Sequence, residues 1–328
     1  MVEKHAPKSE FDKNDILLFV AIVASMSAGV LVPSVGRIFQ PYLLVWLGGL
    51  LFLNLIRMDL GELASTFKAP KTLAILSITK LLVLPFLMYT ITKIVYEPLA
   101  IPVLLLSGVS TGLGAPFVIN VTLEGEKNKR QLSLVVAMVI VTSLAVPFVL
   151  PAIVYSLLGN SQFKIPILQM IFMLVTALFT PIAAGWFVKK RWPTVAKKVD
   201  KRSLPASIIF IALINFGIFA EFSNYFFKKP EFLFVEITVS FILFAAYSAI
   251  GYFTGRIASG KKGNRKELIA TGIVVMSYVN NVLVVVFASQ FFGPDYAALA
   301  AFYNLPYYGL ILLLKKLVIA EQQAKSVS

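Results

Sequence analysis

The sequence contains no cysteine and a single histidine, His5, near its N-terminus. Disulfides and thiolate metal sites are therefore excluded, and no histidine is available for a metal or a proton relay inside the protein. The sequence also lacks the His-Glu-x-x-His, Gly-x-Ser-x-Gly and phosphate-binding-loop motifs. All aspartates lie in tails or loops: Asp12, Asp15, Asp59, Asp200 and Asp295. We therefore expect no enzyme, no ATP-driven motor, no catalytic residue and no cofactor.

Charge is also scarce, because only 14% of the residues are charged while 58% are hydrophobic. A soluble domain is about 25% charged and about 45–50% apolar. The apolar residues form ten segments, each near the ~20 residues that a helix needs to cross a bilayer. Their approximate bounds are 16–33, 41–56, 72–94, 99–123, 132–158, 165–188, 204–222, 232–254, 268–291 and 297–314. The sequence predicts an all-α polytopic membrane protein with ten transmembrane helices.

The basic residues predict the orientation. The net charge is +14, and most of the 30 Lys and Arg residues lie in the two tails and in alternate loops. The opposite loops contain only Arg37, Lys93, Lys164, Lys228 and Lys229. Basic loops stay in the cytoplasm, so both termini are expected there in a multi-pass protein of the cell membrane. The same placement fits lipid headgroups and argues against a nucleic-acid partner.

Lys80 lies inside the third apolar segment, five residues before Pro85. A charge at the centre of a membrane helix costs about 2.5–3.5 kcal/mol on insertion scales, so such residues are usually functional. Lys80 is either a fixed cation of a transport site, or a proton carrier, or a residue that snorkels or pairs structurally with a neighbouring span. Glu236 is the best-placed counter-charge within a span, although its position near a span end suggests an interfacial residue.

The fourth and ninth segments are polar and irregular. The fourth contains Ser107-Gly-Val-Ser-Thr-Gly-Leu-Gly-Ala-Pro116, and the ninth contains Met276-Ser-Tyr-Val-Asn-Asn281. Each is the fourth of five spans, so the halves 15–158 and 159–318 are expected to be inverted repeats, between cytoplasmic tails 1–14 and 319–328. Interrupted helices at matching positions are typical of secondary transporters. Close packing through small residues and hydrogen bonds between helices (about 0.6 kcal/mol each) remain alternatives. Asn54, Asn215 and Asn304 are further buried amides, equally suited to packing or binding.

The chain resembles the bile acid–sodium symporter family, within the larger group that includes arsenite and auxin efflux carriers. The resemblance is clearest in Lys80–Pro85, Gly112–Val118, Thr142-Ser143 with Pro147, Asn280–Leu283 and Phe291–Pro294. It implies a core of spans three to five and eight to ten, and a panel of spans one, two, six and seven. It also implies that the fourth and ninth spans cross where they unwind, next to the third.

The chain departs from the family at the expected sodium ligands. Sodium carriers of the family have Gln at Lys80, Ser-Asn at Pro116-Phe117 and Glu at Val275, and the hydroxyls of the fifth span fall on Val135 and Val139. A lysine ammonium supplies +1 where the family binds one sodium ion. The candidate substrate-binding residues are Lys80, Ser110, Thr111, Gly112, Gly114, Pro116, Asn120, Ser277, Asn280 and Asn281, with no metal site.

We therefore expect a secondary transporter that moves a small organic anion by alternating access without the usual sodium sites. The ion coupling is left open between proton, sodium and none, and the oligomeric state is not predicted. A keto acid or a pantoate-like acid is as plausible a substrate as a bile acid. Alternatives are a sodium-coupled symporter for bile acids or organic acids, a metalloid or auxin-type efflux carrier, and a channel or receptor. The missing cysteine argues against thiolate capture of a metalloid.

Overall fold

The computed structural model describes residues 13–57, 70–122, 125–159, 166–228, 230–260 and 265–309. Within these ranges the chain is helical and has no strand, which confirms the predicted helical class. The predicted tail 319–328 lies outside the described residues. So does the tail 1–14, except that Lys13 and Asn14 already belong to the first helix.

Each predicted apolar segment contains at least one helix. The N-terminal part comprises α1 (Lys13–Leu31), α2 (Pro33–Gly36), η1 (Arg37–Tyr42), α3 (Leu43–Arg57), α5 (Pro70–Ile78), the π-helix η2 (Thr79–Val83), α6 (Leu84–Val95), η3 (Glu97–Leu99), α7 (Ala100–Ser107), α8 (Ala115–Thr122) and α9 (Gly125–Leu158). The C-terminal part comprises α10 (Ile167–Arg191), α11 (Pro193–Glu221), α12 (Ser223–Lys228), α13 (Pro230–Ser259), α14 (Arg265–Ser277), α15 (Asn281–Phe291) and α16 (Pro294–Phe302).

Six helical stretches of the described chain are long and apolar enough to cross a membrane. They are Pro33–Leu53, Pro70–Val95, Arg130–Leu158, Ile167–Arg191, Pro193–Glu221 and Pro230–Ser259. Many large apolar side chains on these helices face outward, including Ile94, Leu168, Phe172, Phe234 and Ile257. A face of this kind suits lipid rather than water, so the protein is a multi-pass membrane protein. The other predicted spans contain shorter helices, and the count of ten spans stays a prediction.

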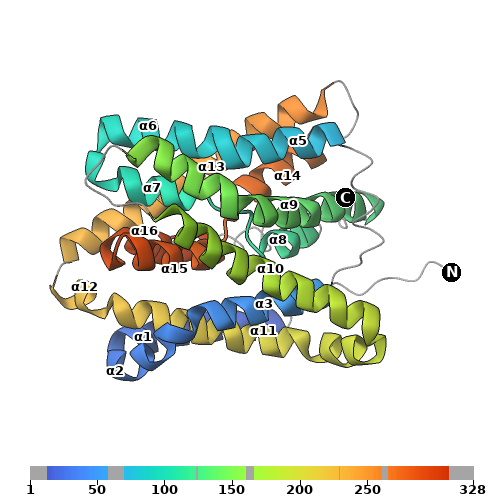
Figure 1. Ribbon diagram of the computed structural model, residues 1–328, viewed down its shortest axis with the longest axis horizontal. Helices are drawn as coiled ribbons and strands as arrows, with labels where there is room; N and C mark the ends of the chain where they lie inside the picture. Colours follow the sequence, from blue (N-terminus) through green and yellow to red (C-terminus); the bar gives the residue numbers. More distant parts are fainter. Residues whose placement is uncertain are drawn as a thin grey trace, which may run out of the picture.

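The helices form two groups that lie side by side (Figure 1). In the lower group of the figure, α11 packs against α1 and α3, with α2 and α12 at one end. In the upper group, α13 packs along α14, α6 along α7, and α9 against α8 and α14. Helix α10 contacts both α3 and α9 and so joins the two groups. Among the short helices, α8 packs against α14 and α7 packs against α15, and most of their described residues are buried.

Glycines set the close contact between α13 and α14. A Cβ on Gly251 would lie 2.7 Å from the carbonyl carbon of Gly272, and a Cβ on Gly272 would lie 3.0 Å from the amide nitrogen of Gly255. Only glycine permits the two backbones to approach this closely. This contact holds α13 against the helix that ends at the interruption in the ninth segment.

Candidate functional site

The fourth segment is interrupted between Ser107, where α7 ends, and Ala115, where α8 begins. The intervening residues 108–114 contain three glycines, and Pro116 follows directly. The Ser107 hydroxyl donates to the carbonyl oxygen of Val103 at 2.6 Å, so it helps to close α7. The break is buried, since Ser110 and Thr111 have no exposed surface. This placement meets the rule that irregular backbone at membrane depth lies inside protein.

The ninth segment is interrupted between Ser277, the last residue of α14, and Asn281, the first of α15. Asn280 caps α15, because its Oδ1 accepts a hydrogen bond from the amide of Leu283 at 3.4 Å. Asparagine is a preferred N-cap residue, and this local chemistry explains why the new helix starts here. The Ser277 hydroxyl donates to the Ile273 carbonyl oxygen at 2.7 Å.

The two interruptions cross and pair with each other through the backbone. The amide of Gly112 donates to the carbonyl oxygen of Tyr278 at 2.6 Å, and the amide of Asn280 donates to that of Ser110 at 2.9 Å. Together these bonds make a single antiparallel bridge between Thr111 and Val279. The freed backbone groups of one broken helix thus satisfy those of the other, which offsets the cost of breaking both.

Three successive carbonyl oxygens at the C-terminal end of α14 each accept a bond from a side chain. Val275 accepts from the Thr111 hydroxyl at 3.1 Å, Met276 from the Lys80 ammonium at 3.3 Å, and Ser277 from the Tyr303 hydroxyl at 2.7 Å. The last carbonyls of a helix have no partner within it and carry its partial negative charge. This end of α14 is therefore a suitable place for a cation, and Lys80 supplies one.

Lys80 reaches this position from the π-helix η2, which precedes α6. Pro85 has no amide hydrogen, so it cannot bond to the Leu81 carbonyl as an α-helix requires. A π turn directly precedes the proline here, and such turns often occur at functional sites. Lys80 has no exposed surface, and its Nζ lies 6.0 Å from the centre of the Tyr247 ring. No carboxylate pairs with it among the residues that the structure describes.

The structure brings most of the predicted site residues together. Lys80, Ser110, Thr111, Gly112, Ser277 and Asn280 all lie at the crossing. Gly114 directly precedes α8, and the half-buried Pro116 is the second residue of that helix. Asn281 donates to the amide oxygen of Asn304, a residue for which the sequence left packing and binding equally open. Asn120 lies on α8, but its side chain, like that of Asn54, is outside what the structure describes.

Several buried polar groups near the crossing lack a hydrogen-bond partner in the described part of the chain. They are the hydroxyls of Ser110 and Ser143 and the Nδ2 of Asn280. An unpaired buried polar group costs about 1–3 kcal/mol, so each favours a ligand or water that completes it. Ser110 and Asn280 lie opposite each other where the two interruptions pair, and the side chains of both can donate a hydrogen bond. These groups can bind a polar or anionic molecule.

Sequence analysis missed three contributors to the crossing. Thr142 on α9 accepts from the Thr111 amide at 3.1 Å, Tyr303 binds the Ser277 carbonyl, and the Tyr307 hydroxyl accepts from the Gly114 amide at 3.0 Å. Thr142 was quoted for the family resemblance but given no role of its own. The tyrosines lie in the tenth apolar segment, where nothing in the local sequence distinguishes them from packing residues.

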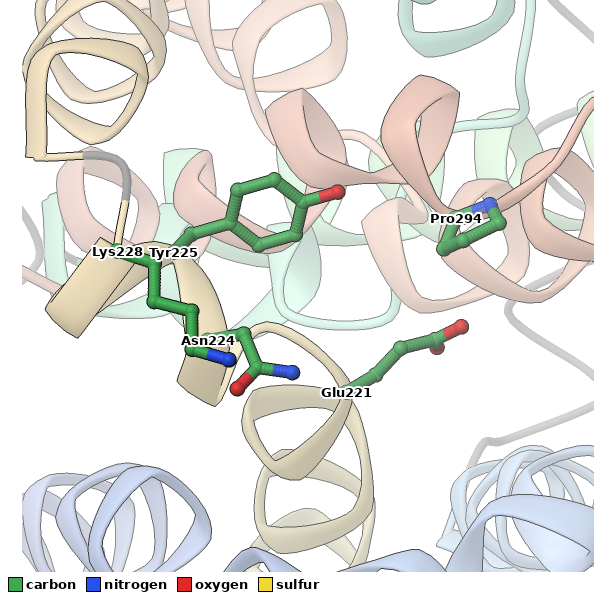
Figure 2. A pocket seen from close by; sticks show the side chains of 5 residues that line it. All are labelled: Glu221, Asn224, Tyr225, Lys228 and Pro294. Atoms are coloured by element: carbon green, nitrogen blue, oxygen red, sulfur yellow. The ribbon is translucent and has the colours of Figure 1, made fainter.

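The interpretation of Glu236 as an interfacial residue is wrong. Its side chain is 1% exposed, and neither carboxyl oxygen has a hydrogen-bond partner in the described ranges. A pocket of about 310 Å³ lies where α11, α12 and α16 meet (Figure 2). It is lined by Glu221, Asn224, Tyr225, Lys228 and Pro294, none of which was predicted as a site residue.

Replacing Tyr307 by phenylalanine tests whether the hydroxyl holds the start of α8. The change leaves the Gly114 amide without its acceptor, and we expect a loss of about 1–3 kcal/mol in the free energy of unfolding. The measurement is the thermal midpoint of the purified protein in detergent. Tyr252→Phe is the matched control, because Tyr252 is 40% exposed on α13. Equal midpoints for the two variants would contradict the assignment.

Comparison with known proteins adds one finding. A search of curated proteins gives no match. The family model described as the sodium bile acid symporter family matches residues 44–229, which is more than half of the chain. The match includes Lys80, the interrupted fourth segment and Thr142, and it agrees with the resemblance found in the sequence. The chain therefore belongs to the sodium bile acid symporter family, whose members are membrane transporters.

Proposed function

We propose that this protein is a secondary transporter that moves a small organic anion across the cell membrane by alternating access, with Lys80 in place of a bound sodium ion. The bond from the Lys80 ammonium to the Met276 carbonyl carries the proposal. Sodium binds to carbonyl, carboxylate and hydroxyl oxygens. At this crossing the Met276 carbonyl oxygen already accepts a hydrogen bond from the Lys80 ammonium. The neighbouring Val275 carbonyl oxygen accepts one from the Thr111 hydroxyl.

Two positions of the family's sodium site differ in charge in this chain: one lacks an acidic residue, and the other has a basic one. Val275 stands where sodium carriers of the family have Glu, and Lys80 stands where they have Gln. A site with a sodium ion and a carboxylate keeps its charge low because the two charges cancel. With the carboxylate gone, the lysine leaves a net charge of +1 in a buried place, and an anionic substrate would neutralise it.

The unpartnered groups at the crossing support an organic acid as substrate. The Ser110 hydroxyl and the side-chain Nδ2 of Asn280 have no hydrogen-bond partner among the described residues, and both residues lie where the two breaks pair. The N-terminal ends of α8 and α15 begin on either side of it, and helix N-termini favour negative charge. A carboxylate of a small keto acid or a pantoate-like acid suits these donors, and a bile acid is the larger alternative.

The proposed architecture follows the predicted topology. Ten spans form two inverted five-helix repeats, 15–158 and 159–318, with both termini in the cytoplasm. The two groups of helices in Figure 1 support a division into a panel, with α1, α3, α10 and α11, and a core that contains both crossing helices. Movement of the core against the panel would expose the crossing alternately to the two sides of the membrane.

Uptake of organic acids into vesicles that contain the protein tests the proposal. The purified protein is reconstituted and offered radiolabelled 2-ketoisovalerate, pantoate and taurocholate at varied sodium and pH. We expect saturable uptake of at least one acid, stimulated by unlabelled acid on the other side, because exchange of this kind distinguishes a carrier from a channel. Strict dependence on sodium would favour the sodium-coupled symporter of bile acids or organic acids instead.

Thermal stability in different salts tests the sodium site without a known substrate. A ligand that binds only the folded state at a hundredfold excess over its Kd stabilises by about 2.7 kcal/mol. We expect the same thermal midpoint in sodium chloride and in choline chloride of equal strength, because Lys80 leaves no sodium site at Met276. A saturable rise of the midpoint with sodium, absent with choline and potassium, would refute this expectation.

A further inference from the structure

Glu236 is a buried carboxyl group for which the proposed binding site has no use. It lies on α13, it is 1% exposed, and both of its oxygens lack a hydrogen-bond partner among the described residues. An ionised carboxylate buried without a partner costs several kcal/mol, whereas a neutral carboxyl group costs much less. The surroundings of Glu236 therefore favour the form that carries a proton.

Glu236 follows, by one helical turn of α13, a residue that packs against the lining of the pocket in Figure 2. Tyr225 lines this pocket, and its ring stacks on that of Phe232 with the centroids 4.9 Å apart. Phe232 and Glu236 are four residues apart on α13, so they share one face about 6 Å apart along the helix. The Tyr225–Phe232 contact therefore links the lining of the pocket to the face of α13 that carries Glu236.

The same face of α13 continues toward Lys80. Ser240 follows Glu236 by four residues and Tyr247 follows it by eleven, and both are fully buried. At 1.5 Å per residue, Tyr247 lies about 16 Å beyond Glu236 along the helix. Its ring centre is 6.0 Å from the Lys80 Nζ. One buried face therefore carries a carboxyl, two hydroxyls and, at its far end, the ammonium of the proposed binding site.

Charged groups on the neighbouring helices do not compensate Glu236. Helix α13 packs against α5, α12, α14 and α16. The charged or titratable residues of these helices and of α13 itself are Lys71, Tyr225, Lys228, Arg265, Lys266, Glu267, Asp295, Tyr296, Glu231, Tyr247, Tyr252 and Arg256. None of them makes a hydrogen bond to either carboxyl oxygen of Glu236. Lys228, Glu231 and Asp295 are exposed at the pocket end, and Arg256 lies about 30 Å along the helix from Glu236.

We propose that Glu236 is the proton-binding site of this carrier, loaded through the pocket lined by Tyr225, and that the proton moves together with the anionic substrate. The proton and a monovalent anion cross as a neutral pair, so no net charge has to pass through the apolar core. The coupling part of this inference rests on the proposed transport function, whereas the proton site itself does not.

Labelling with dicyclohexylcarbodiimide tests the proton site without a substrate. A protonated carboxyl adds across one C=N bond of the reagent: its proton goes to nitrogen, its oxygen bonds to the central carbon, and an acyl shift then gives a stable N-acylurea. Glu231, exposed on the same helix, is the internal control. Peptide mass spectrometry should find Glu236 labelled at neutral and mildly alkaline pH, where Glu231 reacts at least tenfold less. Glu236→Gln removes the label.

Two results would overturn the proton site: labelling of Glu236 only at the acidic pH that also labels Glu231, or no labelling of Glu236 at any pH. The coupling is tested in vesicles that contain a pH-sensitive dye. With an acid that wild type carries, Glu236→Gln should remove the substrate-driven pH change, and Glu231→Gln should keep it. Uptake by wild type without any pH change would refute the coupling. If Glu236 labels as expected but no acid is carried, the proton site stands and the transport assignment falls.

Discussion

Replacing Lys80 by methionine should stabilise the fold and stop transport. Methionine keeps the length of the side chain and removes a buried charge that costs about 2.5–3.5 kcal/mol. Exchange of a buried ionic group for an apolar one of similar volume often stabilises by about 1–4 kcal/mol. We expect the free energy of unfolding to rise by about 1–3 kcal/mol, less the lost bond to the Met276 carbonyl. Transport should fall at least tenfold, which is a change of about 1.4 kcal/mol or more.

Higher stability together with lost transport in Lys80→Met distinguishes a residue of the transport site from a residue that only holds the structure. Lys93→Met is the matched control, since Lys93 is exposed at the end of α6, the helix that continues the same apolar segment. It should change neither property by a measurable amount. The Lys80→Arg variant should also fail to transport, because the larger guanidinium must fit a place with no exposed surface. A lower thermal midpoint in Lys80→Met together with intact transport would show that Lys80 only holds the structure.

Replacing Gly112 by alanine should separate the two interrupted helices. A Cβ at this position would clash with the Val279 carbonyl group, 2.7 Å from its carbon, and would lie 3.1 Å from the carbonyl oxygen of Tyr278. These are backbone atoms that pair with residues 110–112, so they cannot move aside without breaking the bridge. Overpacking costs about 1–3 kcal/mol in an ordinary core, and we expect at least the upper value here.

The measurement is the thermal midpoint and the monodispersity of the purified protein in detergent. Gly309→Ala provides the control, because a Cβ on Gly309 meets no atom of the described residues within 4 Å. That variant should behave as wild type. If Gly112→Ala matched Gly309→Ala in both measurements, the close approach of the two breaks would be incorrect.

The breaks themselves could be predicted because their causes are local. Three glycines and a proline close together in the fourth segment, and an asparagine suited to cap a new helix in the ninth, favour a break at these places. The π-helix at Lys80 could not be predicted from Pro85 alone, because Pro147, Pro151, Pro181 and Pro205 lie inside α-helices.

The partners of the freed backbone groups could not be predicted in this way. Tyr303 and Tyr307 bind Ser277 and Gly114, which are far away in the sequence, and only the packing of the tenth segment against the crossing decides which side chains arrive there. Glu236 shows the same limit. Its position near the end of a segment suggested an interfacial residue, but the neighbouring helices cover that end and bury the carboxyl group.

The sequence by itself determined that the chain is a multi-pass membrane protein with two interrupted helices and a lysine inside an apolar segment. Composition, glycine, proline and charge act over a few residues, and hydrocarbon tolerates few alternatives to a helix. The tertiary structure alone decided that the lysine meets the end of α14, that two tyrosines complete the crossing, and that the Glu236 carboxyl group is buried without a hydrogen-bond partner among the described residues. These features depend on the register between helices, which is set by the packing of side chains that are distant in the sequence.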